Sequence, residues 1–386
     1  MRTGLDALLA DPARLRGRRY GLCCNPTAVD HRYVHALNRL RAAGLPPARL
    51  FGPEHGIAAT AQDMIGVDDD GPETVSLYGD SEASLRPDPA TLEDLDALVF
   101  DIQDIGSRYY TYQATLGFIM EVAGKTDTEV IILDRPNPIN GTSIEGNVVE
   151  PGFESFVSAY PLANRHAMTM GELAMYFQRA LGIDCPLTVL RCEGWLREQW
   201  FDETGLPWVF PSPNMPTLDT AILYPGMCLI EGTNLSEGRG TTRPFHLVGA
   251  PWLDPGRFAE LCRKGALDNG LEGVAFRPAS FWPQFQKHAG QVCGGLEIHL
   301  TNRDALDALL LGLVVLEAAR RANPERFGWR TETYEFVDDP IAIDLLCGSA
   351  EARLGLEAGV RPRELVDAWA AARGQWEDQR AACLLY

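Results

Sequence analysis

Four short apolar runs, each ending in a polar loop rich in Gly, Pro or Asn, constrain the fold of this 386-residue chain more than any other feature. Amphipathic helical patterns over residues 33–43 and 109–123 follow the first and third runs. Alternating strands and helices are typical of βαβ units, which form a parallel sheet. We therefore expect an α/β fold whose polar loops collect at the carboxyl ends of the strands, where ligands bind in such sheets. The four runs cover residues 19–24, 48–51, 97–102 and 129–133.

The α/β pattern gives way to a loop-rich stretch from residue 211, and we place a domain boundary near residue 232, where few regular elements would have to cross. Before this point, Thr169 and Glu172 form a capping box that begins a helix through Leu181. Residues 1–232 are therefore predicted to form one domain, and residues 233–386 a smaller α+β domain. The other expected elements are a strand over 187–192, a loop-rich stretch from 211, a helix over 255–265, a strand over 291–301 and a helix from Asn302 to Arg321.

The charge balance excludes several partners. The chain has 34 basic and 53 acidic residues, a net charge of −19. A field of this sign repels phosphate backbones and anionic membrane surfaces, so neither nucleic acid nor a membrane is expected as a partner. The longest apolar helical stretch, residues 308–316, is far shorter than the roughly 20 residues that cross a bilayer. The N-terminus shows no secretory signal, which favours a cytoplasmic protein.

Cysteine spacing and motif content limit the chemistry further. The nine cysteines are scattered without metal-ligand spacing, and we expect reduced thiols in the core. Motifs for dinucleotides, P-loop phosphates, serine hydrolases and zincins are also absent from the sequence. No cofactor and no metal are therefore expected, and acidic, histidine and arginine side chains in loops remain as candidates.

The Gly-Pro-Glu-His-Gly sequence at residues 52–56 places two titratable side chains in a rigid turn after the second run. A partly desolvated carboxyl beside an imidazole can have its pKa adjusted for general acid catalysis. Glu54 and His55 are therefore candidate catalytic residues. An equally good interpretation of the spacing is that Glu54 caps a helix and His55 bonds a backbone carbonyl.

Polar residues also follow the third and fourth runs. Asp101 interrupts an apolar run, and a buried carboxylate needs a partner. Asp104 and Arg108 have the i, i+4 spacing of an ordinary ion pair at a helix start, which is the favoured interpretation of Asp104. Together with the acid and histidine of the rigid turn, Asp101, Asp104 and Asp134 can also be assembled into a two-metal hydrolase, although no pair has a recognised metal spacing.

Residues 231–243 concentrate carboxylates, hydroxyls, an amide and two arginines in one Gly-rich loop. Such groups suit a hydroxyl-rich ligand that carries a carboxylate, and the negative protein needs a basic contact for an anion. The alternative is that the arginines pair with Glu231 and Glu237 within the loop. The candidate basic contacts are Arg239 and Arg243 in this loop, with Arg108 and Arg165 elsewhere.

Seven motifs follow one another along the chain: GLCCNPTAVD, LFGPEHGI, LVFDIQDIGSRYYTY, ILDRPNPING, RHAMTMGELA, PSPNMPTLDTAILYPGMCLIEGTNLSEGRGTTRPF and the closing LLY. In these motifs, from Tyr20 to Tyr386, the chain resembles the YbbC/NamZ family of exo-β-N-acetylmuramidases. The resemblance implies a glycosidase with a Rossmann-like N-terminal domain, a smaller C-terminal domain and an active site in the cleft between them. It implies release of N-acetylmuramic acid from the non-reducing end of peptidoglycan fragments such as MurNAc-GlcNAc. Without a signal peptide, we expect intracellular recycling of imported disaccharides.

The resemblance also implies roles for individual residues. The GPEHG match makes Glu54 the expected general acid, with His55 beside it. Hydrolysis of a β-glycoside normally uses two carboxyl groups, and the second is drawn from Asp101, Glu231 and Glu237, unless the substrate's acetamido group is the nucleophile. Residues expected to bind the substrate are Asn25, Gln103, Arg108, Arg165, Asn214, Asn234, Arg239 and Arg243.

Two other functions remain open at this point. One is a metal-dependent hydrolase that uses Glu54, His55, Asp101 and Asp134. The other is a non-catalytic amino-sugar-binding protein with the same cleft.

Overall fold

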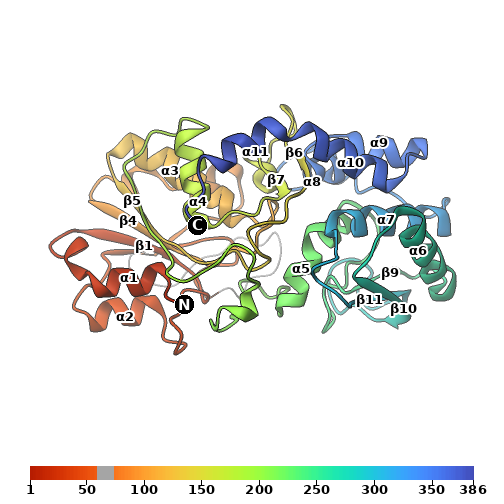
Figure 1. Ribbon diagram of the computed structural model, residues 1–386, viewed down its shortest axis with the longest axis horizontal. Coiled ribbons are helices and arrows are strands. Elements are labelled where there is room, and N and C mark those ends of the chain that lie inside the picture. The colour runs from red at the N-terminus through yellow and green to blue at the C-terminus, as the bar shows by residue number, and fades with distance from the viewer. Residues whose placement is uncertain (59–73) are drawn as a thin grey trace.

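The computed structural model describes residues 1–58 and 74–386, with a parallel sheet in the N-terminal half and a smaller antiparallel sheet in the C-terminal half (Figure 1). The parallel sheet has the strand order β3-β2-β1-β4-β5-β8, and every neighbouring pair is parallel. The predicted α/β sheet is confirmed, and its order reverses between β1 and β4, where doubly wound sheets form a ligand crevice. The strands are β1 (Tyr20–Cys24), β2 (Arg49–Gly52), β3 (Thr74–Ser76), β4 (Ala97–Asp101), β5 (Glu129–Leu133) and β8 (Leu187–Leu190).

Helices cover both faces of this sheet, which explains why the central strand β4 is a buried, largely apolar run (Figure 1). Val99 of β4 packs in the cluster that contains the first two helices, whereas Leu98 and Phe100 belong to the cluster on the opposite face. The helices are α1 (Gly4–Ala10) and α2 (Ala36–Ala42) on one face, and α3 (Tyr112–Thr126) and α4 (Met170–Arg179) on the other.

The C-terminal half contains a three-stranded antiparallel sheet of order β10-β11-β9. The expected helix start at Asn302 is wrong. The Asn302 side chain instead accepts a 3.1 Å hydrogen bond from the Asp304 amide in a turn, and Asp307 caps the helix by accepting from the Leu310 amide at 2.9 Å. The elements are α5 (Leu218–Met227), β9 (Leu247–Ala250), α6 (Pro255–Asn269), β10 (Val274–Phe281), β11 (Cys293–Leu300) and α7 (Ala308–Ala322).

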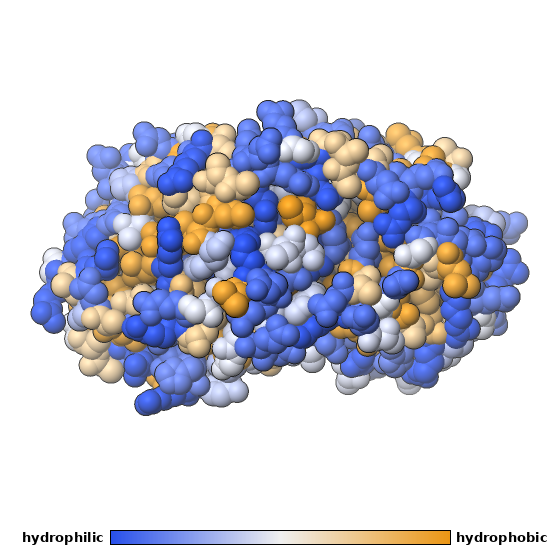
Figure 2. Space-filling model, in the orientation of Figure 1, coloured by the Kyte–Doolittle hydropathy of each residue, from blue (hydrophilic) through white to orange (hydrophobic). Residues whose placement is uncertain are grey.

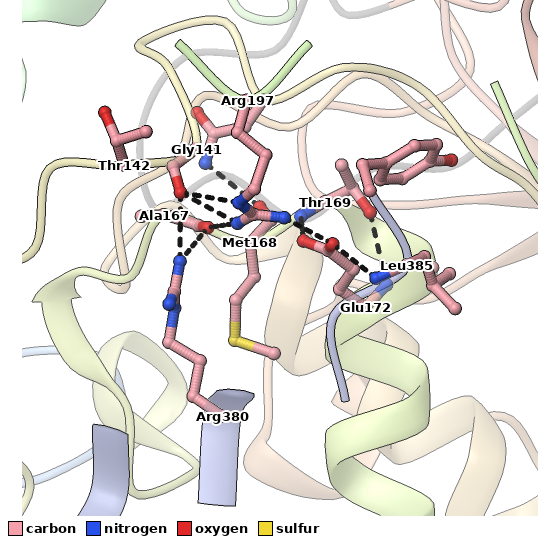
Figure 3. A network of polar contacts seen from close by, with 12 residues as sticks. Gly141, Thr142, Ala167, Met168, Thr169, Glu172, Arg197, Arg380 and Leu385 are labelled. Carbon is pink, nitrogen blue, oxygen red and sulfur yellow. Dashed lines mark hydrogen bonds and ion pairs between the residues drawn. The ribbon is translucent and has the colours of Figure 1, made fainter. Parts of the chain in front are cut away.

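The last helices return along the molecule toward the parallel sheet (Figure 1). Their path ends in what we call the C-terminal clasp: Arg380, Leu385 and Tyr386. The Arg380 guanidinium donates to the carbonyl oxygens of Ala167 at 2.6 Å and Gly141 at 3.0 Å, as Figure 3 shows. These helices are α8 (Ala342–Cys347), α9 (Glu351–Ala358), α10 (Pro362–Ala372) and α11 (Gly374–Ala381). Helix α10 packs against the short antiparallel pair of β6 (Glu145–Val148) and β7 (Ala163–Arg165).

The interior and surface agree with the composition. All nine cysteines are buried and free of disulfides, which confirms the prediction of reduced core thiols. Among the described residues, every helix is too short or too polar to span a bilayer. The face in Figure 2 is largely hydrophilic, with small apolar patches among the polar side chains.

Candidate active site

A cavity, called here the first cavity, lies where loops after the parallel strands meet loops of the C-terminal half. Glu54 follows β2 and residues 109–112 follow β4, so the cavity is at the carboxyl edge of the sheet, where the sequence predicted a site. Its lining residues are Glu54, His55, Tyr109, Tyr110, Thr111, Tyr112, Val157, Ser212, Asn214, Met215, Tyr224, Glu231, Arg239, Phe245, Tyr334 and Glu335.

Glu54 and His55 occupy the two central positions of a β-turn. The Gly56 amide donates to the Pro53 carbonyl at 2.9 Å and closes the turn. His55 has a φ of 70°, a left-handed conformation that turns normally give to glycine. A histidine held there is strained, and strained residues are common at functional sites.

The surroundings of this turn suit a reactive carboxyl. Glu54 is buried, with 7% of its surface exposed, and the Thr111 hydroxyl donates a hydrogen bond to Glu54 Oε2. Among the described residues, the buried His55 Nδ1 has no hydrogen-bond partner. Thr111 is thus positioned to orient the carboxyl, and the imidazole beside it keeps a nitrogen for other contacts.

Tyrosines form a large part of the cavity wall. Tyr110 packs edge-on against Tyr112 and Tyr224, with ring centroids 5.0 and 5.8 Å apart. The Tyr112 hydroxyl accepts from Asn25 Nδ2 at 2.9 Å and donates to the Pro211 carbonyl at 2.6 Å. Burial raises the pKa of Tyr110, Tyr112 and Tyr224 far above the usual value, so these phenols stay neutral. The wall offers apolar ring faces and neutral hydroxyls, which suits a sugar ring.

The Gly-rich loop contributes a charged cluster. Arg239 Nη2 lies 2.7 Å from Glu231 Oε1, and Arg239 Nε lies 3.4 Å from Glu237 Oε1. Lys287 Nζ lies 3.0 Å from Glu237 Oε2. Gly238 and Gly240, with φ of 81° and 78°, turn the backbone on both sides of the arginine. The ion pairs that the sequence offered as an alternative to ligand binding are therefore present for Arg239.

A second cavity adjoins the first and shares Glu231 with it. Its wall combines acidic, basic and amide groups. Asn234 holds the loop in place: its amide donates to the Arg326 carbonyl at 2.7 Å and accepts from the Gly328 amide at 3.1 Å. The lining residues are Glu231, Thr233, Asn234, Glu237, Gln286, Lys287, His288, Trp329, Arg330 and Glu332.

The strand-end aspartates are not among the residues that line these two cavities. Asp101 is fully buried, and its Oδ1 lies 2.6 Å from Nε of Arg135. Asp104 accepts from the Gly106 amide at 2.7 Å and faces His166 Nε2 at 3.5 Å instead of Arg108. Among residues 1–58 and 74–386, no group of three or more metal-ligating side chains is placed to hold an ion.

Three of the four predicted arginines lie away from the cavities. Arg108 is fully buried and donates to the carbonyls of Asn147, Leu162 and Leu346, with distances of 2.7 to 2.8 Å. The predicted ion pair with Asp104 is wrong, because Arg108 precedes α3 and turns to these distant carbonyls; burial lowers its pKa to about 10. Arg165 pairs with Glu145 at 2.5 Å, and Arg243 lies 3.5 Å from Glu297 with its side chain 43% exposed.

Of the four amide residues that the sequence predicted to bind substrate, two line the first or second cavity and two do not. Asn214 lines the first cavity and Asn234 the second. Asn25 reaches the first cavity only through Tyr112, and Gln103 donates to the Asp104 and Pro136 carbonyls at 2.7 and 2.8 Å.

Sequence reasoning missed several lining residues. The tyrosines of the RYYTY segment carried a visible signal, since three aromatic hydroxyls in four residues after a strand end are unusual for a solvated loop. Glu335 carried none, because it lies in an irregular segment without periodicity or a recognised motif.

Comparisons with known proteins identify the family of this chain. The family model described as exo-β-N-acetylmuramidase NamZ, N-terminal, matches residues 20–219, and the C-terminal model matches residues 222–386. The peptidoglycan β-N-acetylmuramidase NamZ of Bacillus subtilis (strain 168) is 39% identical, over all of this chain and 91% of that protein.

Two crystal structures of DUF1343 family proteins from Bacteroides fragilis NCTC 9343 have the same fold. BF0371 has a TM-score of 0.85 and 31% identity, and BF0379 a TM-score of 0.75 and 25% identity. Each comparison covers all of this chain and 98% of the other. The chain belongs to the NamZ family of exo-β-N-acetylmuramidases.

Proposed function

We propose that this glycoside hydrolase releases N-acetylmuramic acid from the non-reducing end of peptidoglycan fragments such as MurNAc-GlcNAc. Family membership supports the muramidase activity. The observation that carries the assignment of the site is the buried carboxyl of Glu54 in a strained turn, facing a cavity walled by tyrosines.

Glu54 acts as the general acid that protonates the leaving oxygen of the glycosidic bond. Thr111 is a positioning residue, because its hydroxyl bonds one carboxyl oxygen and leaves the other for the substrate. His55 lies beside the acid in the same turn and offers a hydrogen-bonding nitrogen to the sugar.

Recognition of the muramic acid involves its lactyl carboxylate. Of the four arginines considered for this contact, Arg239 lines the first cavity. Its pairs with Glu231 and Glu237 fix the guanidinium, and a fixed fork loses less entropy when it binds a carboxylate. We assign the contact to Arg239.

The proposal also gives each half of the chain a separate role. Residues 1–232 carry the acid, and residues 233–386 close the cavity with the turn that contains Tyr334 and Glu335. Cytoplasmic recycling of imported disaccharides remains a prediction from the sequence.

Glu54→Gln tests the proposed function, with Glu260→Gln on the exposed face of α6 as the matched control. The glutamine keeps the shape but cannot protonate an alkoxide leaving group, so the rate on MurNAc-GlcNAc is expected to fall about 10²- to 10⁴-fold. The 4-nitrophenyl glycoside of MurNAc needs little protonation and should lose much less activity.

Three results would contradict this assignment. Folded Glu54→Gln with the wild-type rate on the disaccharide would remove Glu54 from the role. Activity that disappears on chelation and returns with zinc or manganese would favour the metal-dependent alternative, and binding of the disaccharide without turnover by the wild type would favour the sugar-binding alternative.

A further inference from the structure

A two-residue hairpin turn between α7 and α8 places a third carboxylate in the first cavity. Tyr334 and Val337 exchange both backbone hydrogen bonds, at 2.9 and 3.0 Å. Glu335 and Phe336 occupy the tip, and both have positive φ, 47° and 67°. Two-residue hairpin turns with two positive φ angles normally contain Asn and Gly.

The choice of residues in this turn is unfavourable for folding. Glutamate and phenylalanine each have a Cβ that disfavours the left-handed conformation, so Glu335 and Phe336 are both strained. Glu335 is also buried, with 4% of its surface exposed, and buried carboxylates are costly to desolvate. Local rules broken together in this way are characteristic of functional positions.

The contacts around the turn place Glu335 in the lining of the first cavity. Tyr334 and Glu335 both line the first cavity, on loops distant in sequence from Glu54. The Tyr78 hydroxyl donates to Glu335 Oε2 at 3.4 Å, and the Tyr78 ring packs against Phe336 with centroids 6.2 Å apart. The aromatic residue at the tip therefore anchors the turn that presents the carboxylate.

The carboxylates considered from the sequence are engaged elsewhere. Glu231 bonds Arg239 and the Tyr334 hydroxyl, at 2.7 and 3.0 Å. Glu237 pairs with a lysine and an arginine, and Asp101 with Arg135. A close cation stabilises the ionised form and makes a carboxylate a weaker base. Glu335 accepts a hydrogen bond from the Tyr78 hydroxyl, a neutral donor.

We propose that Glu335 is the second catalytic carboxylate and acts as the general base; this rests on the proposed muramidase function. The Glu335 carboxylate accepts a proton from water as the water oxygen bonds C1 of the muramic acid. The C1–O bond breaks, and the leaving oxygen takes the proton of Glu54. The products are the α anomer of N-acetylmuramic acid and the free acceptor sugar, with Glu335 protonated and Glu54 ionised; exchange with solvent restores both.

The first test compares Glu335→Gln with Glu54→Gln on 4-nitrophenyl MurNAc, whose leaving group needs little acid assistance. Loss of the base affects this substrate as much as the disaccharide, so Glu335→Gln is expected to lose at least 10²-fold on both. Glu54→Gln should lose that much on the disaccharide alone. A folded Glu335→Gln protein within threefold of wild type on both substrates would overturn the proposal.

The second test examines the reacting face of the sugar. Azide is a small anion that attacks C1 without a base, so Glu335→Ala with sodium azide is expected to form the α-glycosyl azide. Proton NMR of the wild-type reaction should show α-N-acetylmuramic acid first. A β first product, or no azide product from folded Glu335→Ala, would overturn the base role.

A third variant separates catalysis from folding. Glu335→Asn relieves strain, because asparagine tolerates positive φ, and should keep the wild-type Tm or raise it while activity is lost. Asp127→Asn is the matched control, since Asp127 is exposed and has a φ of 54° at the end of α3. If Glu335 has only a structural role, the variant should have a lower Tm.

The two proposals can fail separately. A wild-type protein that is inactive on MurNAc glycosides would contradict the proposed function itself. An active wild type together with an active Glu335→Asn variant would contradict only the role of Glu335 as the base.

Discussion

The Tyr386 hydroxyl donates a hydrogen bond of 2.7 Å to Asp134 Oδ2, just beyond the end of β5. Asp134 also accepts from the Thr169 hydroxyl and the Gly171 amide, both at 2.8 Å. Burial raises the pKa of Asp134 to about 6. A residue that the sequence offered as a metal ligand thus anchors the C-terminal clasp to the parallel sheet.

Tyr386→Phe is expected to destabilise the fold by about 1 to 3 kcal/mol. The change removes a donor to Asp134 and the acceptor of the Cys192 amide, which lies 2.8 Å from the Tyr386 hydroxyl. Urea unfolding measures the effect, with Tyr33→Phe as the control because Tyr33 is 68% exposed. Equal stability of the two variants would show that the clasp hydrogen bonds contribute nothing.

Asp134→Asn should change the pH dependence of stability. The pKa of Asp134 is about 6 in the folded protein and near 4 in the unfolded chain, so the folded state binds the proton more tightly. This contribution is fully present below about pH 4 and is lost as the pH rises through 6. A difference of about 2 in pKa corresponds to about 3 kcal/mol.

The measurement is the free energy of unfolding of both proteins at pH 4 and pH 7. The free energy of unfolding of the wild type should fall relative to that of the variant by about 2 kcal/mol between these two pH values. A gap that does not change with pH would contradict the raised pKa.

Asp101→Asn is expected to act on stability and not on catalysis. It leaves the buried Arg135 without its counter-charge, which costs about 3 to 5 kcal/mol in comparable buried pairs. Glu193→Gln, in an exposed pair with Arg2, should cost less than about 1 kcal/mol. Thermal unfolding and kcat per folded molecule test this; a stable but inactive Asp101→Asn would return Asp101 to the catalytic candidates.

Arg239→Gln is expected to reduce the preference for muramic acid. A charge-assisted contact with the lactyl carboxylate contributes about 1.5 to 3 kcal/mol, so kcat/KM on 4-nitrophenyl MurNAc should fall roughly 10- to 150-fold. The value on the N-acetylglucosamine glycoside, which lacks that carboxylate, should change little. Arg243→Gln, in the same loop but outside the first cavity, is the control. If kcat/KM falls by the same factor on both glycosides, the role of Arg239 is structural.

Much of the parallel sheet was predictable because runs of apolar residues in the sequence coincide with its buried strands. The run at 129–133 is β5 without any shift, and the run at 97–102 is β4 with one residue removed. The helix expected over 109–123 begins later, at Tyr112, because the preceding residues form the cavity wall. Apolar periodicity identifies elements, but it does not distinguish a helix turn from a loop that faces a ligand.

The site was predictable only where local sequence sets local geometry. Glu54 follows a strand in a rigid turn, and its position in the cavity follows from those neighbours. Arg108 has a spacing that suggests a local partner, yet it bonds Leu346 in a distant helix. Glu335 depends on two positive φ angles that its sequence disfavours. Long-range contacts decide both cases, and a single sequence does not record them.

The C-terminal clasp has a mechanical consequence. Because Arg380 and Leu385 bind Gly141 and Glu172, the first half is completed by a segment that arrives only after the second half has been traversed (Figure 3). The polypeptide therefore crosses between the halves twice. The second half is therefore held to the first at both of its chain ends, by the continuous chain at its start and by the clasp contacts at its end.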